Sequence, residues 1–385
     1  MKKRVFITIL LSVLLLSGCA EKKQEDDMNP QPEPSDVIDI VESYQYAGVV
    51  SEPIVIDTEK EVELYLDEAE FEIAQGAAIT VNNAKLLTIH LKGMTSATLK
   101  DAFLRANCPV VIDGDGEVHL SGDDTLFDVK DLTLSCQGVH IRSKANVINA
   151  QTLKITAGNL VITNGNDGIH AVNFYQEGGA VQINVKDDAI HCEELIRISG
   201  GDMSLVAHEG LEARNVEVSD GNLLIVADDD GINATDNGSI NISGGMIKVM
   251  SLNDGIDSNG NIILSGGMLM IYSVGQDEAE IMDFETESVI RGGTFIGLGS
   301  SSSRSFVRVE NQQLLTVDYP FKQNEEISIR KNSEEIFAFR LEADVSRLFF
   351  SSEAVQSGSI YEIYMGDTPV RTIEIAAPQS HTVSE

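Results

Sequence analysis

The motif that decides the fold recurs five times, as NDGIHA (166–171), DDAIHC (187–192), HEGLEA (208–213), DDGINA (229–234) and NDGIDS (253–258). AEIMDF (279–284) is a degraded sixth copy. A second marker, a small turn, lies between successive copies, at Gly158-Asn159, Gly178-Gly179, Gly200-Gly201, Gly221-Asn222, Gly244-Gly245, Gly266-Gly267 and Gly292-Gly293. Two independent markers with one shared period of about 22 residues indicate a structural repeat.

The stretches between these markers read as strands. Runs such as AVQINV (180–185) and LIRIS (195–199) alternate apolar and polar residues, and no helical period persists in this region. Hexapeptide coils repeat about every 18 residues, and leucine-rich repeats need a Leu and Asn consensus that this chain lacks. The sequence therefore predicts an all-β parallel β-helix, a solenoid with about 21–26 residues and about three short strands per coil.

Equivalent residues of successive coils stack about 4.8 Å apart in such a fold. An inward apolar ladder is predicted at Ile169, Ile190, Leu211, Ile232, Ile256 and Met282, and a ladder of small residues at Ala171, Cys192, Ala213, Ala234 and Ser258. A tight turn is expected just before the apolar ladder, at Gly168, Gly210, Gly231 and Gly255. One reading of this turn is that these glycines have positive φ. QGVHIR (137–142) is interpreted as a divergent copy of the motif.

The N-terminus predicts export and lipid attachment. A basic start, a short apolar stretch and LSGC (16–19) indicate a lipoprotein signal peptide over 1–18, with Cys19 as the lipidated first residue of the mature chain. The polar stretch that follows predicts a flexible tether over 19–45. The protein is thus expected at the extracellular face of the cell envelope, held to a membrane through its lipid only.

The β-helix is expected over 46–300, and a small antiparallel cap and tail of β-hairpins over 301–385. Cys108, Cys136 and Cys192 stand in apolar, strand-like contexts, and no CxxC spacing occurs. Buried free thiols are therefore expected, with a Cys108–Cys136 bridge as the alternative.

Acidic residues outnumber basic ones 61 to 27, which gives a formal net charge of −34. This charge argues against a nucleic-acid partner and against electrostatic docking on anionic lipid. An acidic polymer would bind only through a bridging cation. Trp is absent, so a binding platform of stacked Trp rings is excluded. A monomer is expected.

Stacking the coils places acidic residues in rows. The first row holds Asp167, Asp188, Glu209, Asp230, Asp254 and Glu280; the row one residue before it holds Asn166, Asp187, His208, Asp229 and Asn253; the row three residues after it holds His170, His191, Glu212, Asn233, Asp257 and Asp283. Like charges about 4.8 Å apart repel by roughly 1 kcal/mol per neighbouring pair even in water. Calcium, which takes six to eight oxygen ligands, would relieve this repulsion.

Calcium is therefore expected at Asp167, Asp187, Asp188, Glu209, Glu212, Asp229, Asp230, Asp254 and Asp257. Asp228 is either a further ligand or solvated. An alternative is that the Asp and Asn residues serve only as turn formers that bond their own backbone. Zinc held by His170, His191 and His208 is a second alternative.

DDGINATDNGSINISGG (229–245) and NDGIDSNGNIILSGG (253–267) resemble a family of secreted carbohydrate-binding proteins of plant-wall-degrading bacteria. SSEAVQSGSIYEIYMGD (351–367) resembles the terminal segment of that family. The resemblance implies a right-handed parallel β-helix similar to pectate lyases that binds calcium and an acidic polysaccharide such as polygalacturonate, or cellulose. The acids that match by position are Asp167, Asp230, Asp254 and Asp257. Ala189, Glu209 and AEIMDF (279–284) depart from the pattern.

Two functions of different class follow. A binding protein would use calcium on the acidic rows to hold uronate carboxylates. A lyase would also need an Arg or Lys base beside the acids, and the nearby candidates, Lys186, Arg197 and Arg214, form no row. We therefore expect a polysaccharide-binding protein that is not an enzyme, with a calcium-dependent lyase and a structural or adhesive surface protein as alternatives.

Overall fold

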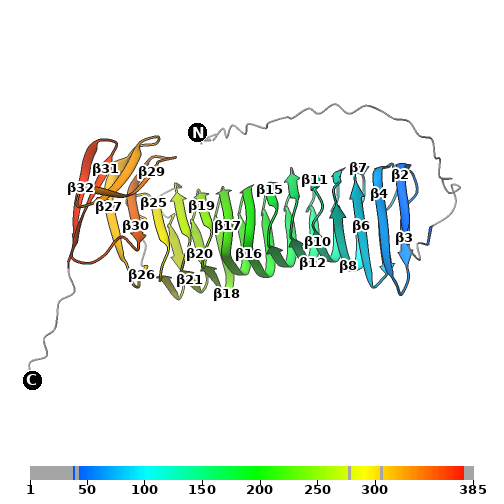
Figure 1. Ribbon diagram of the computed structural model, residues 1–385, viewed down its shortest axis with the longest axis horizontal. Coiled ribbons are helices and arrows are strands. Elements are labelled where there is room, and N and C mark those ends of the chain that lie inside the picture. The colour runs from blue at the N-terminus through cyan, green and yellow to red at the C-terminus, as the bar shows by residue number, and fades with distance from the viewer. Residues whose placement is uncertain (1–37, 40–42, 276–278, 304–306, 377–385) are drawn as a thin grey trace, which may run out of the picture. The chain divides into compact units, whose positions relative to one another are not determined.

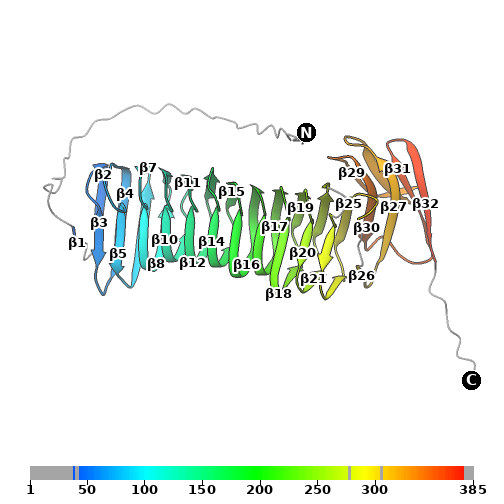
Figure 2. The same cartoon turned by 180° about the vertical axis from the view of Figure 1, so that it is seen from behind.

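The computed structural model describes residues 38–39, 43–275, 279–303 and 307–376. The expected signal peptide, Cys19 and most of the expected tether lie outside the described residues. Throughout the described ranges every regular element is a β-strand, and successive coils stack on one another from β2 to β25 (Figures 1 and 2). No helix in these ranges has the length and apolarity that crossing a membrane requires.

Each coil contributes strand segments to three faces. The first face contains β1 (Ile38–Asp39), β3 (Ile54–Asp57), β5 (Ile79–Asn83), β20 (Ile256–Ser258) and β23 (Met282–Phe284). The second contains β6 (Leu86–Lys92), β21 (Asn261–Leu264), β24 (Glu287–Ile290) and β26 (Arg308–Val309). The third contains β7 (Met94–Leu99), β9 (Glu117–Gly122), β11 (Gly138–Arg142), β13 (Asn159–Thr163), β15 (Ala180–Asn184), β19 (Met246–Ser251), β22 (Met268–Ser273) and β25 (Thr294–Gly299).

Other strands continue round a corner and belong to more than one face. These are β2 (Tyr44–Val50), β4 (Glu61–Phe71), β8 (Leu104–Gly114), β10 (Phe127–Leu134), β12 (Ile148–Ile155), β14 (Ile169–Gln176), β16 (Ile190–Ala207), β17 (Leu211–Ala227) and β18 (Ile232–Ile242). Because β-branched and Leu residues alternate with polar ones along each segment, one side of every face points into the solenoid. The parallel β-solenoid predicted from the repeat is confirmed.

One parallel ladder runs the length of the solenoid on the first face. Its successive partners are Ile38, Ile54, Ile79, Leu104, Phe127, Ile148, Ile169, Ile190, Leu211, Ile232, Ile256 and Met282. The six positions predicted from the motif are only 0–3% exposed, and the predicted ladder of small residues is also buried. Apolar side chains from all three faces fill the interior, so each coil is stabilised mainly by its neighbours.

The positive φ considered for the motif glycines is wrong. Gly231 and its equivalents are not among the residues with positive φ, whereas the turn glycines are, as at Gly245 with φ 82°. Gly231 is needed for space: an added Cβ would lie 2.1 Å from Val249 Cγ1 and 2.6 Å from the carbonyl oxygen of Gly255. The motif glycine therefore permits close packing of coils, and the turn glycine permits the left-handed backbone.

The interpretation of QGVHIR (137–142) as a copy of the motif is also wrong. Gly138–Arg142 pairs with Glu117–Ser121 and with Asn159–Thr163 on the third face. The motif position is taken instead by Phe127 in that coil and by Ile148 in the next. A glycine followed by an alternating apolar strand occurs on both faces, and such a short match cannot distinguish them.

The three described cysteines, Cys108, Cys136 and Cys192, are free and buried. Cys192 packs in the small-residue ladder between Ala171 and Ala213. Burial raises the pKa of the Cys136 thiol to about 11. The thiols therefore belong to the apolar core, as expected, and the alternative Cys108–Cys136 bridge is not formed.

The C-terminal strands turn antiparallel and cover the last coil. β30 (Val345–Ser352) pairs with β25 of the solenoid and with β27 (Gln313–Phe321). A separate four-stranded sheet has the order β29 (Glu334–Arg340), β28 (Glu326–Lys331), β31 (Ser359–Met365), β32 (Thr368–Ile375). The predicted antiparallel cap is confirmed. Its Tyr361 is fully buried, and its hydroxyl accepts the Gln356 N–H at 2.8 Å.

Candidate functional site

The acidic rows lie at the corner where the third face turns into the first. In the first row from Asp188 onward, each acid's carbonyl accepts a hydrogen bond from the residue that follows the acid one coil earlier, as Asp188 does from Gly168 at 2.9 Å and Asp254 from Gly231 at 3.0 Å. The preceding row is linked in the opposite direction, because the Asp229 N–H donates to the carbonyl of His208 one coil earlier at 2.9 Å. The backbone thus fixes the rows and leaves the carboxylates to face one another.

The third row lies on the outer side of the first face, in the order His170, His191, Glu212, Asn233, Asp257, Asp283. Each of these residues alternates with an inward residue of the two buried ladders, so its side chain points outward. The spacing of the motif therefore brings three polar rows to one corner. All nine residues expected to bind calcium belong to these rows.

The first close cluster joins Asp188, His191 and Glu212. His191 Nδ1 lies 2.8 Å from Glu212 Oε2 and 3.3 Å from Asp188 Oδ2. These two carboxylates raise the pKa of His191 to about 10, and the hydrogen bond from His191 lowers that of Glu212. The ring of His170 stacks on that of His191 with centroids 4.9 Å apart. Protonated His191 therefore neutralises part of the negative charge here.

Asp167 and Asp187 lie at the edge of this cluster. Burial, followed by the charges of Asp188 and Asp187, raises the pKa of Asp167. Asp187 is exposed. These two acids thus extend the negative surface of the first cluster by one coil.

The second close cluster joins His208, Glu209 and Asp229, whose ligand atoms lie within 4.8 Å of one another. Glu209 Oε2 accepts a hydrogen bond from Asn233 Nδ2 at 3.3 Å. Burial and then the charge of Glu212 raise the pKa of Glu209 to about 7. The side chain of Glu209 therefore lies between the first and second clusters and couples them electrostatically.

Asp230, Asp254 and Asp257 form a third group, which holds most of the uncompensated acid. Asp230 is only 8% exposed, and its Oδ1 accepts both Asn253 Nδ2 and the Asp254 N–H at 2.9 Å. Burial, then the charges of Asp230 and Asp283, raises the pKa of Asp254 to about 7 and that of Asp257 to about 6. These carboxyl groups favour a proton, or another cation, in their immediate surroundings.

Lys and Arg side chains of the described residues do not neutralise the negative charge of the third group. Among the ion pairs of the described residues, Asp230, Asp254 and Asp257 form none with Lys or Arg. Glu280, the last acid of the first row, differs because it lies near Arg347 of the cap, whose pKa is raised first by the hydrogen bond to Asp318 and less by the charge of Glu280.

Two of the three candidate lyase bases are engaged with other acids. Arg197 Nε lies 2.7 Å from Glu217 Oε2 on the second face, and Arg214 Nη1 lies 3.5 Å from Glu194 Oε2. Lys186 is exposed in the turn before Asp187. Both arginines are thus engaged in ion pairs, and Lys186 is the one candidate base of the three that lies beside the acidic rows.

A groove of about 550 Å³ lies on the first face over the earlier coils. Its polar lining includes Arg105, Asn107, Asp128, Lys130, Asn149, Gln151 and His170. His170 belongs to the third row, so the groove adjoins the acidic rows on the same face. The Oδ1 atom of Asn149 is buried without a hydrogen-bond partner among the described residues. The groove thus offers amide and cationic groups next to the acids.

Sequence reasoning missed two features of this molecule. It did not anticipate that His191 would bridge two carboxylates, because side-chain direction at the corner depends on the turn. It also missed a cluster of Glu117, His119 and His140 on the third face. The signal was present, since His119 and His140 are one repeat apart in GEVHLSG (116–122) and QGVHIR (137–142).

Comparison with known proteins supports a carbohydrate ligand. The chain matches the family model described as "Carbohydrate-binding domain-containing protein" over residues 38–214 and 195–304. A solved structure described as the polysaccharide lyase-like protein from C. thermocellum, gadolinium derivative, is 18% identical, over 65% of this chain and 84% of that chain, with a TM-score of 0.28. No curated protein matches. The family model matches more than half of this chain, and the chain therefore belongs to the family of carbohydrate-binding domain-containing proteins.

Proposed function

We propose that the protein binds an acidic polysaccharide through calcium ions held on the acidic rows. The observation that carries this proposal is the third group: Asp230, Asp254 and Asp257 lie together, partly buried, with raised pKa values and no Lys or Arg partner among the described residues. A protein that gained nothing from this arrangement would be destabilised by it. A cation bound by these carboxylates would neutralise their charge and make the group a binding site.

The donor types suit calcium. Asp230, Asp254 and Asp257 offer carboxylate oxygens, and the side chains of Asn233 and Asn253 lie in the same rows. Hard divalent ions prefer such oxygens over nitrogen or sulfur. Asp188, Glu209, Glu212 and Asp229 would contribute in the first two clusters, where His191 and His208 make the donor set mixed. Calcium, when bound, would supply positive charge to which uronate carboxylates attach.

The adjoining groove supplies contacts that do not need calcium. Asn107, Asn149 and Gln151 can hydrogen-bond sugar hydroxyls, and Lys130 can pair with a uronate carboxylate. Arg105 is already paired with Asp101. An oligosaccharide that follows the solenoid axis would thus meet neutral and basic groups first and the acidic rows next.

Binding is favoured over lyase chemistry by the placement of the basic residues. Proton abstraction from a uronate needs a base within about 3 Å of the proton it removes. Arg197 and Arg214 pair with Glu217 and Glu194, so they are not free to serve, and this leaves only Lys186, which is exposed in a turn. The family assignment, which is to carbohydrate binding, points the same way.

The test is retention of the purified protein on immobilised polygalacturonate in calcium and in EDTA, with absorbance of unsaturated product recorded throughout. We expect retention in calcium, elution by EDTA and no product. Product formation would make the protein a lyase. Retention that is equal in both buffers would contradict the role of calcium, and no retention in either would contradict the acidic glycan.

We further propose that the chain is a lipoprotein on the extracellular face of the envelope, with the lipid on Cys19. The lipobox LSGC (16–19) supports this proposal. Metabolic labelling with a fatty-acid analogue should modify the natural protein and not the Cys19→Ala variant. Equal labelling of the two would contradict it.

A further inference from the structure

On the third face, away from the acidic rows, three side chains converge. Glu117 and His119 lie two residues apart on β9, so both point outward, and His140 follows His119 on the next coil. His119 Nε2 lies 3.0 Å from Glu117 Oε2, and His140 Nε2 lies 3.8 Å from the same oxygen. The two imidazole rings stack with centroids 4.4 Å apart. Two nitrogens and one carboxylate oxygen thus face a common point.

Gly138 leaves the space in which these groups meet. It lies in register between Glu117 and Asn159, at a position where the neighbouring coils carry side chains. Its φ is not positive, so the backbone does not require glycine. An added Cβ would lie 2.9 Å from His140 Nε2 and 3.4 Å from Glu117 Cγ. The glycine therefore serves the approach of His140 to Glu117.

Gln137 orients the carboxylate. Its Nε2 donates to Glu117 Oε1 at 2.8 Å, which directs the other oxygen, Oε2, toward the two histidines. Hydrogen bonds of this kind hold ligating carboxylates in place in metal sites. The group therefore has both a set of ligand atoms and a residue that positions one of them.

We propose that Glu117, His119 and His140 bind a first-row transition-metal dication of the zinc class. Two imidazole nitrogens and one carboxylate oxygen form a donor set that zinc accepts with a further position left open. Ligands about 2.0–2.1 Å from a tetrahedral ion lie about 3.3 Å from one another. The ligand atoms here lie within 4.8 Å of one another, so small rotations of the three side chains bring them to that geometry.

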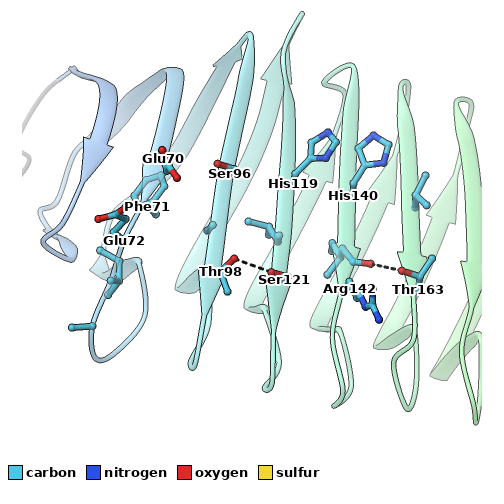
Figure 3. Close-up of a pocket in the computed structure, with 16 residues that line it drawn as sticks. Glu70, Phe71, Glu72, Ser96, Thr98, His119, Ser121, His140, Arg142 and Thr163 are labelled. Atoms are coloured by element: carbon cyan, nitrogen blue, oxygen red, sulfur yellow. Dashed lines mark hydrogen bonds between the residues drawn. The ribbon is translucent and has the colours of Figure 1, made fainter. Parts of the chain in front are cut away.

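The surroundings leave the site accessible. His119 and His140 line a groove of about 660 Å³ together with Ser96, Thr98, Ser121 and Arg142 (Figure 3). The two imidazoles lie side by side on neighbouring coils at one edge of that groove (Figure 3). Water can therefore reach the ion and fill its open position.

This site is independent of the proposed calcium function. Its nitrogen ligands select a softer ion than calcium, which prefers oxygen. It also lies on the third face and over earlier coils than the acidic rows. Failure of one site therefore leaves the other untouched.

The experiment titrates the full mature chain, without a histidine tag, with Co²⁺ in excess calcium, which occupies oxygen-only sites. Visible absorption reports nitrogen ligation of Co²⁺, and calorimetry gives the affinity and stoichiometry. Outer-shell partners alone change metal affinity by about 10–100-fold. We therefore expect His119→Gln and His140→Gln each to weaken binding at least about 100-fold.

Two further variants separate ligand loss from misfolding. Gly138→Ala keeps all three ligands but obstructs their approach, and we expect it to weaken Co²⁺ binding while circular dichroism stays unchanged. His90→Gln is the matched control, because His90 pairs with Asp113 on the second face, and it should bind Co²⁺ like the natural protein. The proposal would be overturned if the natural protein did not bind Co²⁺. It would also be overturned if the His119 and His140 variants bound Co²⁺ as tightly as the natural protein.

Discussion

Replacing Asp254 by Asn should stabilise the calcium-free protein at pH 8 and destroy much of its response to calcium. The pKa of Asp254 is raised from its ordinary value of 3.8 to about 7, chiefly by burial. Between these values the folded protein binds more protons than the unfolded chain, so its free energy of unfolding falls as pH rises. At about 1.4 kcal/mol per pKa unit, ionising Asp254 in the folded protein costs about 4 kcal/mol.

The Asn variant removes this cost and keeps the local hydrogen bond. Asp254 Oδ1 accepts the Glu280 N–H at 2.6 Å, and an amide oxygen accepts it equally well. The charges of Asp230, Asp257 and Asp283 share the repulsion, so we expect a gain of about 2–4 kcal/mol at pH 8 in EDTA. The gain should vanish near pH 4, where the carboxyl group of the natural protein is protonated.

Urea unfolding followed by circular dichroism at pH 4 to 8, in EDTA and in calcium, measures these differences. In calcium the order should reverse, because the natural protein gains binding free energy and the variant loses a ligand. A variant that is less stable than the natural protein at pH 8 in EDTA would refute the reasoning. So would a natural protein whose calcium-free stability does not fall between pH 5 and pH 8.

The remaining predictions concern the core, the packing glycines and the histidines. Ile232→Ala removes a fully buried side chain and should cost about 2–5 kcal/mol in urea unfolding; a loss below 1 kcal/mol would contradict its place in the ladder. Gly231→Ala should cost about 1–3 kcal/mol, because its methyl group would meet Val249 and the Gly255 carbonyl, and an unchanged midpoint would contradict the close approach. In EDTA, the pKa of His191, raised to about 10, keeps its side chain charged between pH 6 and 8. The charged side chain stabilises the folded protein fully below pH 6.5, and this stabilisation is lost as pH rises through 10. Histidine NMR should show no titration of His191 in that range, and a midpoint near 6.5 would contradict the pairing with Glu212 and Asp188.

The sequence allowed the fold and the acidic rows to be predicted because the repeat translates directly into register. In a solenoid, residues one period apart must stack, so Ile169 to Met282 and the accompanying acids could be aligned without coordinates. The copies from 166 to 258 keep this period closely. The antiparallel cap could also be anticipated, since the last coil exposes an open strand edge.

The features that could not be predicted from the sequence are the placement of segments on the faces and of side chains at the corners between them. QGVHIR resembles the motif over too few residues to assign it to a face, so the convergence of Glu117, His119 and His140 stayed hidden. The motif glycines proved to be required by the neighbouring coil and not by their own φ, as Gly231 shows. The bridge from His191 to Asp188 and Glu212 depends on side-chain rotamers at a turn, which a spacing rule does not contain.

The most direct test of the central claim compares two charge-matched variants on immobilised polygalacturonate in calcium. Asp254→Asn/Asp257→Asn removes two charges from the rows, and Glu334→Gln/Glu335→Gln removes two from exposed positions of β29 in the cap. We predict that the first variant elutes early while the second is retained like the natural protein. Equal retention of both variants would contradict the claim that calcium on the acidic rows holds the polysaccharide.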